Sequence, residues 1–565
     1  MTTLSDGHKK VPMMFRAQVN GRSQLQRIQD LRYSDTDEQD AERWVDEWVI
    51  KAYPDSPTFS NEVQTRTYDL SWRFVTNGGQ DDGIIRPVVG AKGWPFYPGS
   101  SMKGLFRDAC DQTQAARYCG QELSNKDFKP GILRFHGGYP TDSRWTDQLL
   151  DIIHPQQDRQ VKDNRRSSAF FQVSLYKPEL KFGISSTETL DASEWETIWT
   201  IWEKAIASGL GCRVSAGYGQ PKKVTGQILY LTRLKGQGQA AKLIDGTGEF
   251  RPNIFRAAIR GHALRIFGGL TDDDTADRIV ERLFGGITRG ASQVGLLSMA
   301  FTEESLEIDE FGQRSYRQPV YRVNGVLTWR LTQTISESKK AAVTKLIRAL
   351  NRFAMMLGGF GKSWRRADHR LVYPDYYDEG SKPLIGCHWE WLGARAQTFD
   401  TRAHQLEQVG PYIDQVRQAA QEWMTLQGHP PKNEPAIWRE AWHPTRVQVW
   451  GRMAQEKEDS EAVHWLHGPY RRADRVAGIR EGSIYKSALT GQMGQIGRLW
   501  HRMYPWIRLK KDPNDPKKRI PVPRPECFEL LTIFPDNLPE ARDFIYFLEN
   551  QQTQFKKLWP VSSRP

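Results

Sequence analysis

Two neighbouring stretches carry the strongest signal: Asp81-Asp82-Gly83-Ile84-Ile85-Arg86-Pro87, then Pro98-Gly99-Ser100-Ser101-Met102-Lys103-Gly104-Leu105-Phe106-Arg107. The first places two adjacent carboxylates on a loop flanked by glycines. The second is a Pro-Gly-Ser-Ser turn that opens a cationic segment, which we expect to be a short helix over 102–110. Acids beside a cationic helix start suit phosphate binding or phosphodiester chemistry. The alternative is a solvated turn, where Asp-Gly pairs are common.

The composition favours a large protein that binds a polyanion. The 565 residues allow about three to four domains, or two large ones. Lysine and arginine number 79 against 67 acidic residues, which gives a net charge of +12 and a pI near 9.3. That balance indicates nucleic acid as the first candidate partner, with a merely basic protein as the alternative. The 20 tryptophans can stack on bases, although we expect most of them in the core.

Metal, disulfide and membrane signatures are weak. The five cysteines are scattered and form no CxxC pair, which argues against a disulfide framework or a zinc knuckle. The pairs His464-x-x-His467 and Cys387-His388 lack the further ligands of a closed zinc site. The sequence has no apolar run of about 18 residues and no signal-peptide pattern. We therefore expect a soluble, cytoplasmic protein without a membrane partner.

Each of two amphipathic helices is followed by a glycine-rich loop. Apolar stripes predict helices over 193–208 and 339–357. Neither loop has a Walker motif or a GxGxxG that follows a strand, which excludes those nucleotide sites. Backbone amides and guanidinium groups can instead line a phosphate backbone. The glycines are Gly209, Gly211, Gly217 and Gly219 in the first loop and Gly358, Gly359 and Gly361 in the second, and the cations are Arg213, Lys362, Arg365 and Arg366.

The turn and the glycine-rich loop recur at nearly one spacing. Pro98 and Pro252 stand 154 residues apart, and Gly209 and Gly358 stand 149 apart. Two matching offsets predict a tandem duplication of a domain. In the second copy, Arg256 and Arg260 take the places of Lys103 and Arg107, whereas the acidic loop holds only Asp245.

Together these segments resemble the RAMP superfamily, the ferredoxin-like, RNA-recognition-type subunits of CRISPR effector complexes. The resemblance lies in the glycine loop with Asp81, the run PGSSMKGLFR and the run GLGCRVSAGYG over 209–219, and it covers about two-thirds of the chain. The first half is most similar to the backbone subunit of type III complexes. Two fused units resemble the tandem backbone subunit of type III-D systems, and the two-domain RAMP subunit of type III-B complexes is the nearest rival.

The resemblance implies an α+β fold of two tandem ferredoxin-like domains with antiparallel sheets. The first domain would cover 1–225, with a thumb-like insertion over 134–166, where the sequence looks irregular. The second would cover 226–565. Its long C-terminal region, beyond about residue 400, is a candidate to complete its sheet.

The resemblance also implies a metal-dependent endoribonuclease subunit in antiviral defence. An Asp on the first loop would cut target RNA with Mg²⁺ or another divalent cation. That role of catalytic residue and metal ligand falls on Asp81, with Asp82 beside it, and Asp245 is the candidate for a second site. The partners would be guide RNA, complementary single-stranded target RNA, and other RAMP and large subunits. Guide RNA would be gripped by Ser100, Ser101, Lys103, Arg107, Arg256 and Arg260, together with the two glycine-rich loops and their cations.

Two other functions stay open at this stage. One is a purely structural RNA-binding subunit, in which Asp81 is a turn residue. The other is a stand-alone guide-processing ribonuclease, which would use His or Lys acid–base chemistry without metal. Target cleavage by an Asp81→Ala variant, and cleavage of precursor RNA in chelator, discriminate among the three.

Overall fold

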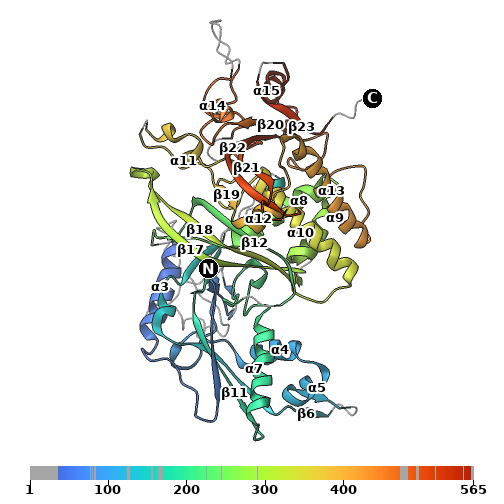
Figure 1. Cartoon of the computed structure of the whole chain (residues 1–565). Helices are drawn as coiled ribbons and strands as arrows, with labels where there is room; N and C mark the ends of the chain where they lie inside the picture. The colour runs from blue at the N-terminus through green and yellow to red at the C-terminus, as the bar shows by residue number, and fades with distance from the viewer. Residues whose placement is uncertain are drawn as a thin grey trace. The chain divides into compact units, whose positions relative to one another are not determined.

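The computed structural model describes residues 36–561, except 77, 79, 82–83, 124–126, 154–156, 163–169, 224–225, 244, 289–290, 379, 471–481, 492–494, 516 and 551–552. The chain divides into two compact units (Figure 1). Unit 1 comprises the described residues within Met1–Pro155, Ser167–Gln227 and Leu243–Gly246. Unit 2 comprises those within Gln156–Arg166, Ile228–Lys242 and Thr247–Pro565. Both units combine helices with mainly antiparallel sheets, which confirms the predicted α+β class.

The main sheet of unit 1 has the strand order β1-β11-β7. Strand β1 (Gln64–Asp69) pairs antiparallel with β11 (Glu179–Ser186), and β11 pairs antiparallel with β7 (Leu133–Pro140). In chain order this is the 1-3-2 arrangement of a ferredoxin-like sheet. A ferredoxin-like sheet has a fourth strand beside its first. At that position the described residues form a single antiparallel β-bridge, between Leu70, just after β1, and Pro221.

Strand β7 corrects the expectation of an irregular segment from residue 134. Its glycines fit the sheet: a Cβ on Gly138 would lie 2.6 Å from the ring of Phe182. Gly137 has φ +77°, and the register with β11 shifts at this point. Glycines inside a strand often mark such a bulge or a close approach. The excursion from the sheet therefore begins only after Pro140.

Two helices bury their apolar faces in the core of unit 1. Helix α4 (Gly99–Ala109) buries Met102 and Phe106. Helix α7 (Ala192–Ile206) places its predicted tryptophan stripe in the same core, where Trp202 is fully buried with its ring centroid 5.0 Å from that of Phe182. Helix α3 (Thr36–Lys51) adds further tryptophans to this core.

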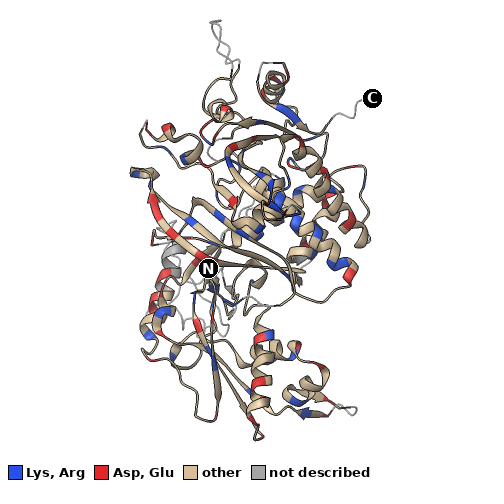
Figure 2. Cartoon of the chain, in the orientation of Figure 1, with Lys and Arg blue, Asp and Glu red and all other residues tan. Residues whose placement is uncertain are grey.

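Unit 2 contains a complete ferredoxin-like sheet, with the order β17-β18-β12-β19 and antiparallel pairs throughout. In chain order this is 2-3-1-4, as in a β-α-β-β-α-β unit. Helices α8 (Asn253–Gly268), α9 (Asp273–Phe284) and α10 (Glu337–Leu357) fill its two crossovers. The β17–β18 hairpin projects at the left of Figure 2, where acidic residues mark its length. The strands are β12 (Ile228–Gln239), β17 (Leu297–Phe311), β18 (Gln318–Leu331) and β19 (His388–Trp391).

The C-terminal region forms a sheet of its own, and its described residues add no strand to the preceding one. Its order is β21-β22-β20-β23, again 2-3-1-4, with α14 (Glu461–His467) and α15 (Pro539–Asn550) in the crossovers. The structure thus adds a third ferredoxin-like sheet to the two that were predicted. Its strands are β20 (Gln448–Ala454), β21 (Leu499–Lys511), β22 (Arg519–Ile533) and β23 (Lys556–Trp559).

Helix α6 (Gln157–Lys162), from within the predicted thumb, belongs to unit 2. Val161 is fully buried in the core of that unit. Lys162 Nζ lies 2.6 Å from Asp277 Oδ2, and Arg439 donates to the carbonyl oxygen of Gln160 at 2.8 Å. The segment therefore passes from one compact unit into the other and back.

One long helix and several short elements complete the two units. Helix α13 (Val409–Leu426) packs on α10 in unit 2, and Figure 1 shows α8, α9, α10 and α13 grouped beside the sheets of that unit. The remaining strands and α-helices are β2 (Arg73–Phe74), α5 (Gln112–Gln114), β5 (Gly120–Glu122), β6 (Phe128–Pro130), β10 (Leu175–Tyr176), β13 (Ala241–Lys242), β14 (Gly248–Glu249), β15 (Gly286–Thr288), β16 (Ala291–Gln293), α11 (His369–Val372) and α12 (Gly393–Phe399), besides those of the small sheet described below.

Candidate nucleic-acid interface

The start of α4 presents a polar, cationic face. Ser100, Ser101 and Arg107 are exposed, and Lys103 is half-buried. None of these four side chains forms a hydrogen bond or an ion pair within the described part of the chain. Pro98 is the N-cap residue and gives no side-chain cap, so the first N–H groups of the helix have no side-chain acceptor there. Such a helix start attracts phosphate through these groups and the helix dipole.

Close packing against β7 fixes this helix start. Tyr97 and Gly138 exchange two backbone hydrogen bonds of 2.9 Å just before the helix. A Cβ on Gly99 would lie 2.0 Å from the carbonyl oxygen of Phe135, so only glycine fits there. The Pro-Gly-Ser-Ser turn therefore combines a close backbone approach at Gly99 with exposure of the two serines.

The first glycine-rich loop lies next to this helix start. The ring centroid of Phe74 is 6.0 Å from that of Tyr97, which precedes the helix, and a Cβ on Gly211 would lie 2.9 Å from Phe74. Cys212 N donates to the carbonyl oxygen of Val75 at 2.9 Å. The four predicted glycines of the loop all have positive φ. Arg213, the loop cation, also has positive φ and is half-buried.

Asp81 lies on a small four-stranded sheet of unit 1 with the order β3-β4-β9-β8. Asp81 pairs with Ile84 of the next strand. The side chain of Asp81 and the whole of Asp82 lie outside the described residues, so their catalytic role stays a prediction. The strands are β3 (Gln80–Asp81), β4 (Ile84–Ile85), β8 (Leu150–Ile153) and β9 (Phe170–Val173), of which β4 and β9 form a parallel pair.

This small sheet is joined to the glycine-rich loop. The hydroxyl of Tyr218, in the loop, donates to the buried carboxylate of Asp151 on β8 at 2.7 Å. Ile85 of β4 packs in one apolar cluster with Tyr218 and Cys212. Unit 1 thus brings together three predicted features: the start of α4, the first glycine-rich loop and the strand that carries Asp81.

The predicted cations of the second copy are engaged inside unit 2. Arg256 donates to the carbonyl oxygen of Phe284, and Arg260 is half-buried. Asp245, the second acidic candidate, is exposed. Of the second loop's three predicted glycines, only Gly361 has positive φ, whereas Gly358 and Gly359 do not.

Two of the second loop's three cations serve the fold. Arg365 donates to the buried carboxylate of Glu440 at 2.7 Å. Arg366 donates to main-chain carbonyl oxygens, and burial lowers its pKa to about 10. Lys362 is exposed, and its ammonium lies 3.2 Å from the carbonyl oxygen of Ala240. Sequence alone cannot separate such anchoring arginines from phosphate-binding ones, since Glu440 lies 75 residues away.

In the third sheet, a carboxylate of the protein itself, that of Glu529, lies at the start of the first crossover helix, α14. Glu529 is fully buried and accepts hydrogen bonds from Ala462 N at 2.9 Å and Ser460 Oγ at 2.5 Å, beside the start of α14. Arg452 also donates to this carboxylate, at 2.5 Å. The protein thus supplies the anion at α14, in contrast to α4, whose start holds no described acidic side chain.

Metal binding at the predicted acidic loop finds little support from neighbouring groups. Within the described residues no set of three His, Cys, Asp or Glu side chains is placed to hold a metal ion. The loop itself would supply at most the carboxylates of Asp81 and Asp82. Mg²⁺ keeps several waters and often binds through one or two carboxylates plus phosphate oxygens.

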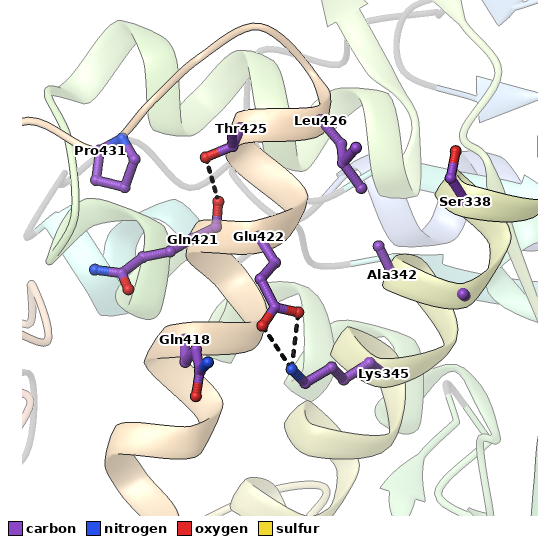
Figure 3. Close-up of a pocket in the computed structure, with 10 residues that line it drawn as sticks. Ser338, Ala342, Lys345, Gln418, Gln421, Glu422, Thr425, Leu426 and Pro431 are labelled. Carbon is purple, nitrogen blue, oxygen red and sulfur yellow. Dashed lines mark hydrogen bonds and ion pairs between the residues drawn. The ribbon is translucent and has the colours of Figure 1, made fainter.

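A groove of about 760 Å³ opens between α10 and α13 in unit 2 (Figure 3). Lys345 and Glu422 are the ionisable residues among those that line it, and they pair with N–O distances of 2.7 and 2.8 Å. Because these two charges neutralise each other, the groove offers no uncommitted acid or base for catalysis.

A membrane span requires a helix that is both long and apolar. None of the described helices is both long enough and apolar enough to cross a membrane.

Comparison with solved structures gives distant likenesses to this chain. No protein-family model and no curated protein sequence matches the chain. A chain of a structure described as "Type IV-B CRISPR Complex" is similar with a TM-score of 0.20 and 15% identity, over 28% of this chain and 88% of that one. A chain of "Cryo-EM structure of the Type III-B Cmr-beta bound to cognate target RNA and AMPPnP, state 2, in the presence of ssDNA" is similar with a TM-score of 0.25 and 9% identity, over 56% and 97%. TM-scores this low leave the function to be inferred from the chain's own residues.

Proposed function

We propose that this chain is a guide-RNA-binding backbone subunit of a type III CRISPR ribonucleoprotein. The observation that carries the proposal is the start of α4, where Ser100, Ser101 and Arg107 are exposed and uncommitted beside the first glycine-rich loop. Hydroxyl, guanidinium and backbone N–H donors there suit a run of phosphates bound without base reading. The net charge of +12 supports a polyanionic partner, and the sequence resemblance supplies the CRISPR context.

In this proposal the chain also helps to cleave the target RNA that pairs with the guide. The carboxylate of Asp81 would orient the 2′-hydroxyl of the target for attack on the adjacent phosphorus. The 2′-hydroxyl would give up its proton to solvent water as the 2′-O–P bond forms, and the departing O5′ would take a proton from water as the P–O5′ bond breaks, leaving a cyclic phosphate and a 5′-hydroxyl. When bound, Mg²⁺ would stabilise the charge that develops on the phosphate oxygens. The neighbourhood of β3 and the glycine-rich loop supports this assignment.

A non-catalytic subunit is the second candidate. Asp81 pairs with Ile84 across a two-residue connection, Asp82-Gly83. Asp-Gly is a preferred pair for such a hairpin turn on conformational grounds alone. The two acids would then serve the turn, and RNA binding at α4 would be unaffected.

RNA binding is tested with the full chain and a labelled single-stranded RNA of mixed sequence. Replacing Lys103 and Arg107 by Gln should weaken binding roughly tenfold and reduce the salt slope, because two phosphate contacts are lost. The matched control replaces Lys129 and Lys181 by Gln, since both are exposed cations of unit 1 that lie outside α4. An equal loss in the two variants would refute a defined site and indicate a merely basic protein.

Cleavage is tested in the assembled complex with a matched guide. Asp81→Asn should abolish at least one cut in the target while assembly and guide content stay normal. Asp245→Asn is the comparison for the second acidic loop, and the number of cuts removed by each variant counts the working loops. Undiminished cleavage by both variants would sink the nuclease part and leave the structural subunit.

A further inference from the structure

Two hairpins of unit 2 occupy the same topological position with opposite charge. Each joins the second and third strands of a ferredoxin-like sheet, β17 to β18 in one and β21 to β22 in the other. Residues 303–317 contain five acidic side chains and two arginines. Residues 508–519 contain six cationic side chains and two aspartates. Because the two hairpins share one backbone plan, that plan does not dictate the sign of their charge.

Arginines of the same sheet neutralise part of the charge of the acidic hairpin. Glu304 pairs with Arg233 of β12 at 2.6 Å. Further along the hairpin, Glu307 lies 3.8 Å from Arg322, and Glu310 pairs with Arg317. Three of its five acids therefore have a cationic partner within the sheet, Glu307 at the long distance of 3.8 Å.

The basic hairpin has no comparable neutralisation. Its two carboxylates hold the turn: Asp512 accepts from Asn514 N at 2.9 Å, and Asp515 accepts from Lys517 N at 3.0 Å. One weak ion pair remains, between Lys518 and Asp512 at 3.9 Å. In the described part of the chain no carboxylate lies within 4.0 Å of the other cations, which are all exposed: Arg508, Lys510, Lys511, Lys517 and Arg519.

The pairing of the hairpin keeps like charges together. Lys511 lies directly opposite Arg519 in the antiparallel register. Like charges in directly opposed positions destabilise a hairpin, so this pair costs stability in the free protein. A bound polyanion would remove that cost, because phosphates placed between the two cations screen their repulsion.

Prolines make this hairpin unsuitable for adding a further strand. Pro521, Pro523 and Pro525 occupy alternate positions of β22, beyond the end of its pairing with β20 at Cys527. Proline has no N–H to donate, and alternate residues of a strand direct their N–H groups to the same side. Pro521 and Pro523 lie opposite Leu509 and Ile507 of β21, and the register shifts beyond Ile507, so these two prolines leave the other edge of β22 without N–H donors. A partner would therefore bind through the cationic side chains and not by edge pairing.

From these observations we propose that the β21–β22 hairpin is a second nucleic-acid-binding surface, which holds an RNA phosphate backbone. Cationic side chains project from both faces: Arg508 and Lys510 share one face, and Lys511 lies on the other with Arg519 opposite. Two residues on one face are about 6.6 Å apart, so several phosphates are contacted at once. The contacts are independent of sequence, because lysines reach phosphates as point charges. The identity of the polyanion as RNA rests on the proposed function.

The test compares two triple variants of the full chain that lose the same net charge. The hairpin variant carries Lys510→Gln, Lys511→Gln and Arg519→Gln. Loss of three phosphate contacts should reduce the salt slope of single-stranded RNA binding by about 2 and weaken binding at least tenfold at about 50 mM salt. The matched control carries Arg314→Gln, Arg317→Gln and Arg322→Gln on the β17–β18 hairpin, and we expect its affinity to stay within about twofold of the unmodified chain.

The outcomes separate this proposal from the proposed function. If the unmodified chain binds RNA and the two triple variants lose equal affinity, the hairpin proposal is overturned and the function stands. If the unmodified chain binds no RNA even at low salt, both fall. Unchanged RNA binding by the hairpin variant, with loss of binding to phosphatidylserine vesicles or to polyglutamate, would assign the hairpin to a membrane or an acidic protein and overturn the proposal.

Discussion

Replacing Glu440 by Gln should destabilise unit 2 far more than an ordinary charge removal. The carboxylate of Glu440 is fully buried and accepts from Arg265 Nε at 2.7 Å, from Arg365 at 2.7 Å and from Arg439 at 3.1 Å. Burial by itself would raise the pKa of Glu440, but the three guanidinium groups outweigh it and hold that pKa below its usual value. The Glu440→Gln variant keeps the shape and leaves three cations without their anion.

The magnitude follows from the burial of the arginines that remain. Arg265 is 1% exposed, so water cannot replace the lost carboxylate. Breaking a buried pair by removing one partner costs about 3–5 kcal/mol, a third or more of the stability of many domains. The control is Glu422→Gln, which removes the exposed pair with Lys345 and should cost less than about 1 kcal/mol.

Urea unfolding and hydrogen exchange together measure this effect. With a slope of about 3 kcal/mol per M, Glu440→Gln should lower the unfolding midpoint of unit 2 by about 1 M or more. Exchange should increase first in α6, because Arg365 and Arg439 both donate to Gln160. A midpoint shift no larger than that of Glu422→Gln, with α6 still protected, would refute the reasoning that the cluster depends on this buried anion.

Three further predictions follow from single positions. Gly219→Ala should destabilise unit 1 by about 2 kcal/mol or more in thermal unfolding, since φ is +59° and the new Cβ would lie 1.9 Å from the carbonyl oxygen of Leu210; an unchanged melting temperature would contradict this. Burial lowers the pKa of His369 to about 3 and of His467 to about 4, both below the unfolded value of about 6.5, so the unfolded state binds more protons as pH falls. Stability should be complete above pH ~6.5 and decline as pH falls from about 6 to 5, and His467→Gln should reduce that slope by up to about 1.4 kcal/mol per pH unit; equal slopes would count against the assignment. His262→Leu should stabilise unit 2 by about 1 kcal/mol in urea unfolding, because neither ring nitrogen has a described partner; a loss of stability would indicate an unseen one.

Sequence periodicity predicted the parts of the fold that depend on local pattern. The stripe over 193–208 became α7, with Trp199 and Trp202 in the core, and the stripe over 339–357 became α10. The segment expected over 102–110 is α4, which begins at Gly99. Such stripes are readable because a helix repeats its buried face every three to four residues regardless of what covers it.

The parts that failed depend on contacts distant in sequence. Strand β7 was hidden because Gly137 and Gly138, required by a bulge and by the ring of Phe182, look like loop residues in isolation. Arg365 and Arg366 look like phosphate ligands until the residues that receive their hydrogen bonds are known. The two serines and Arg107 of α4 are exposed, and their role in RNA binding stays a prediction.

The position of α6 has a consequence for how the chain is made. Residues 157–162 leave the ribosome before any strand of the second and third sheets, yet Gln160 finds its partners 205 and 279 residues later, at Arg365 and Arg439. The core of unit 2 therefore cannot be completed until most of the protein has been synthesised. Until then, Val161 lacks the residues that bury it in the folded protein. A fragment that starts at residue 228 would lack this segment, so we expect it to need α6 supplied as a separate peptide to reach full stability. Translation speed between residues 162 and 439, or a chaperone acting over that interval, would then set the yield of folded protein.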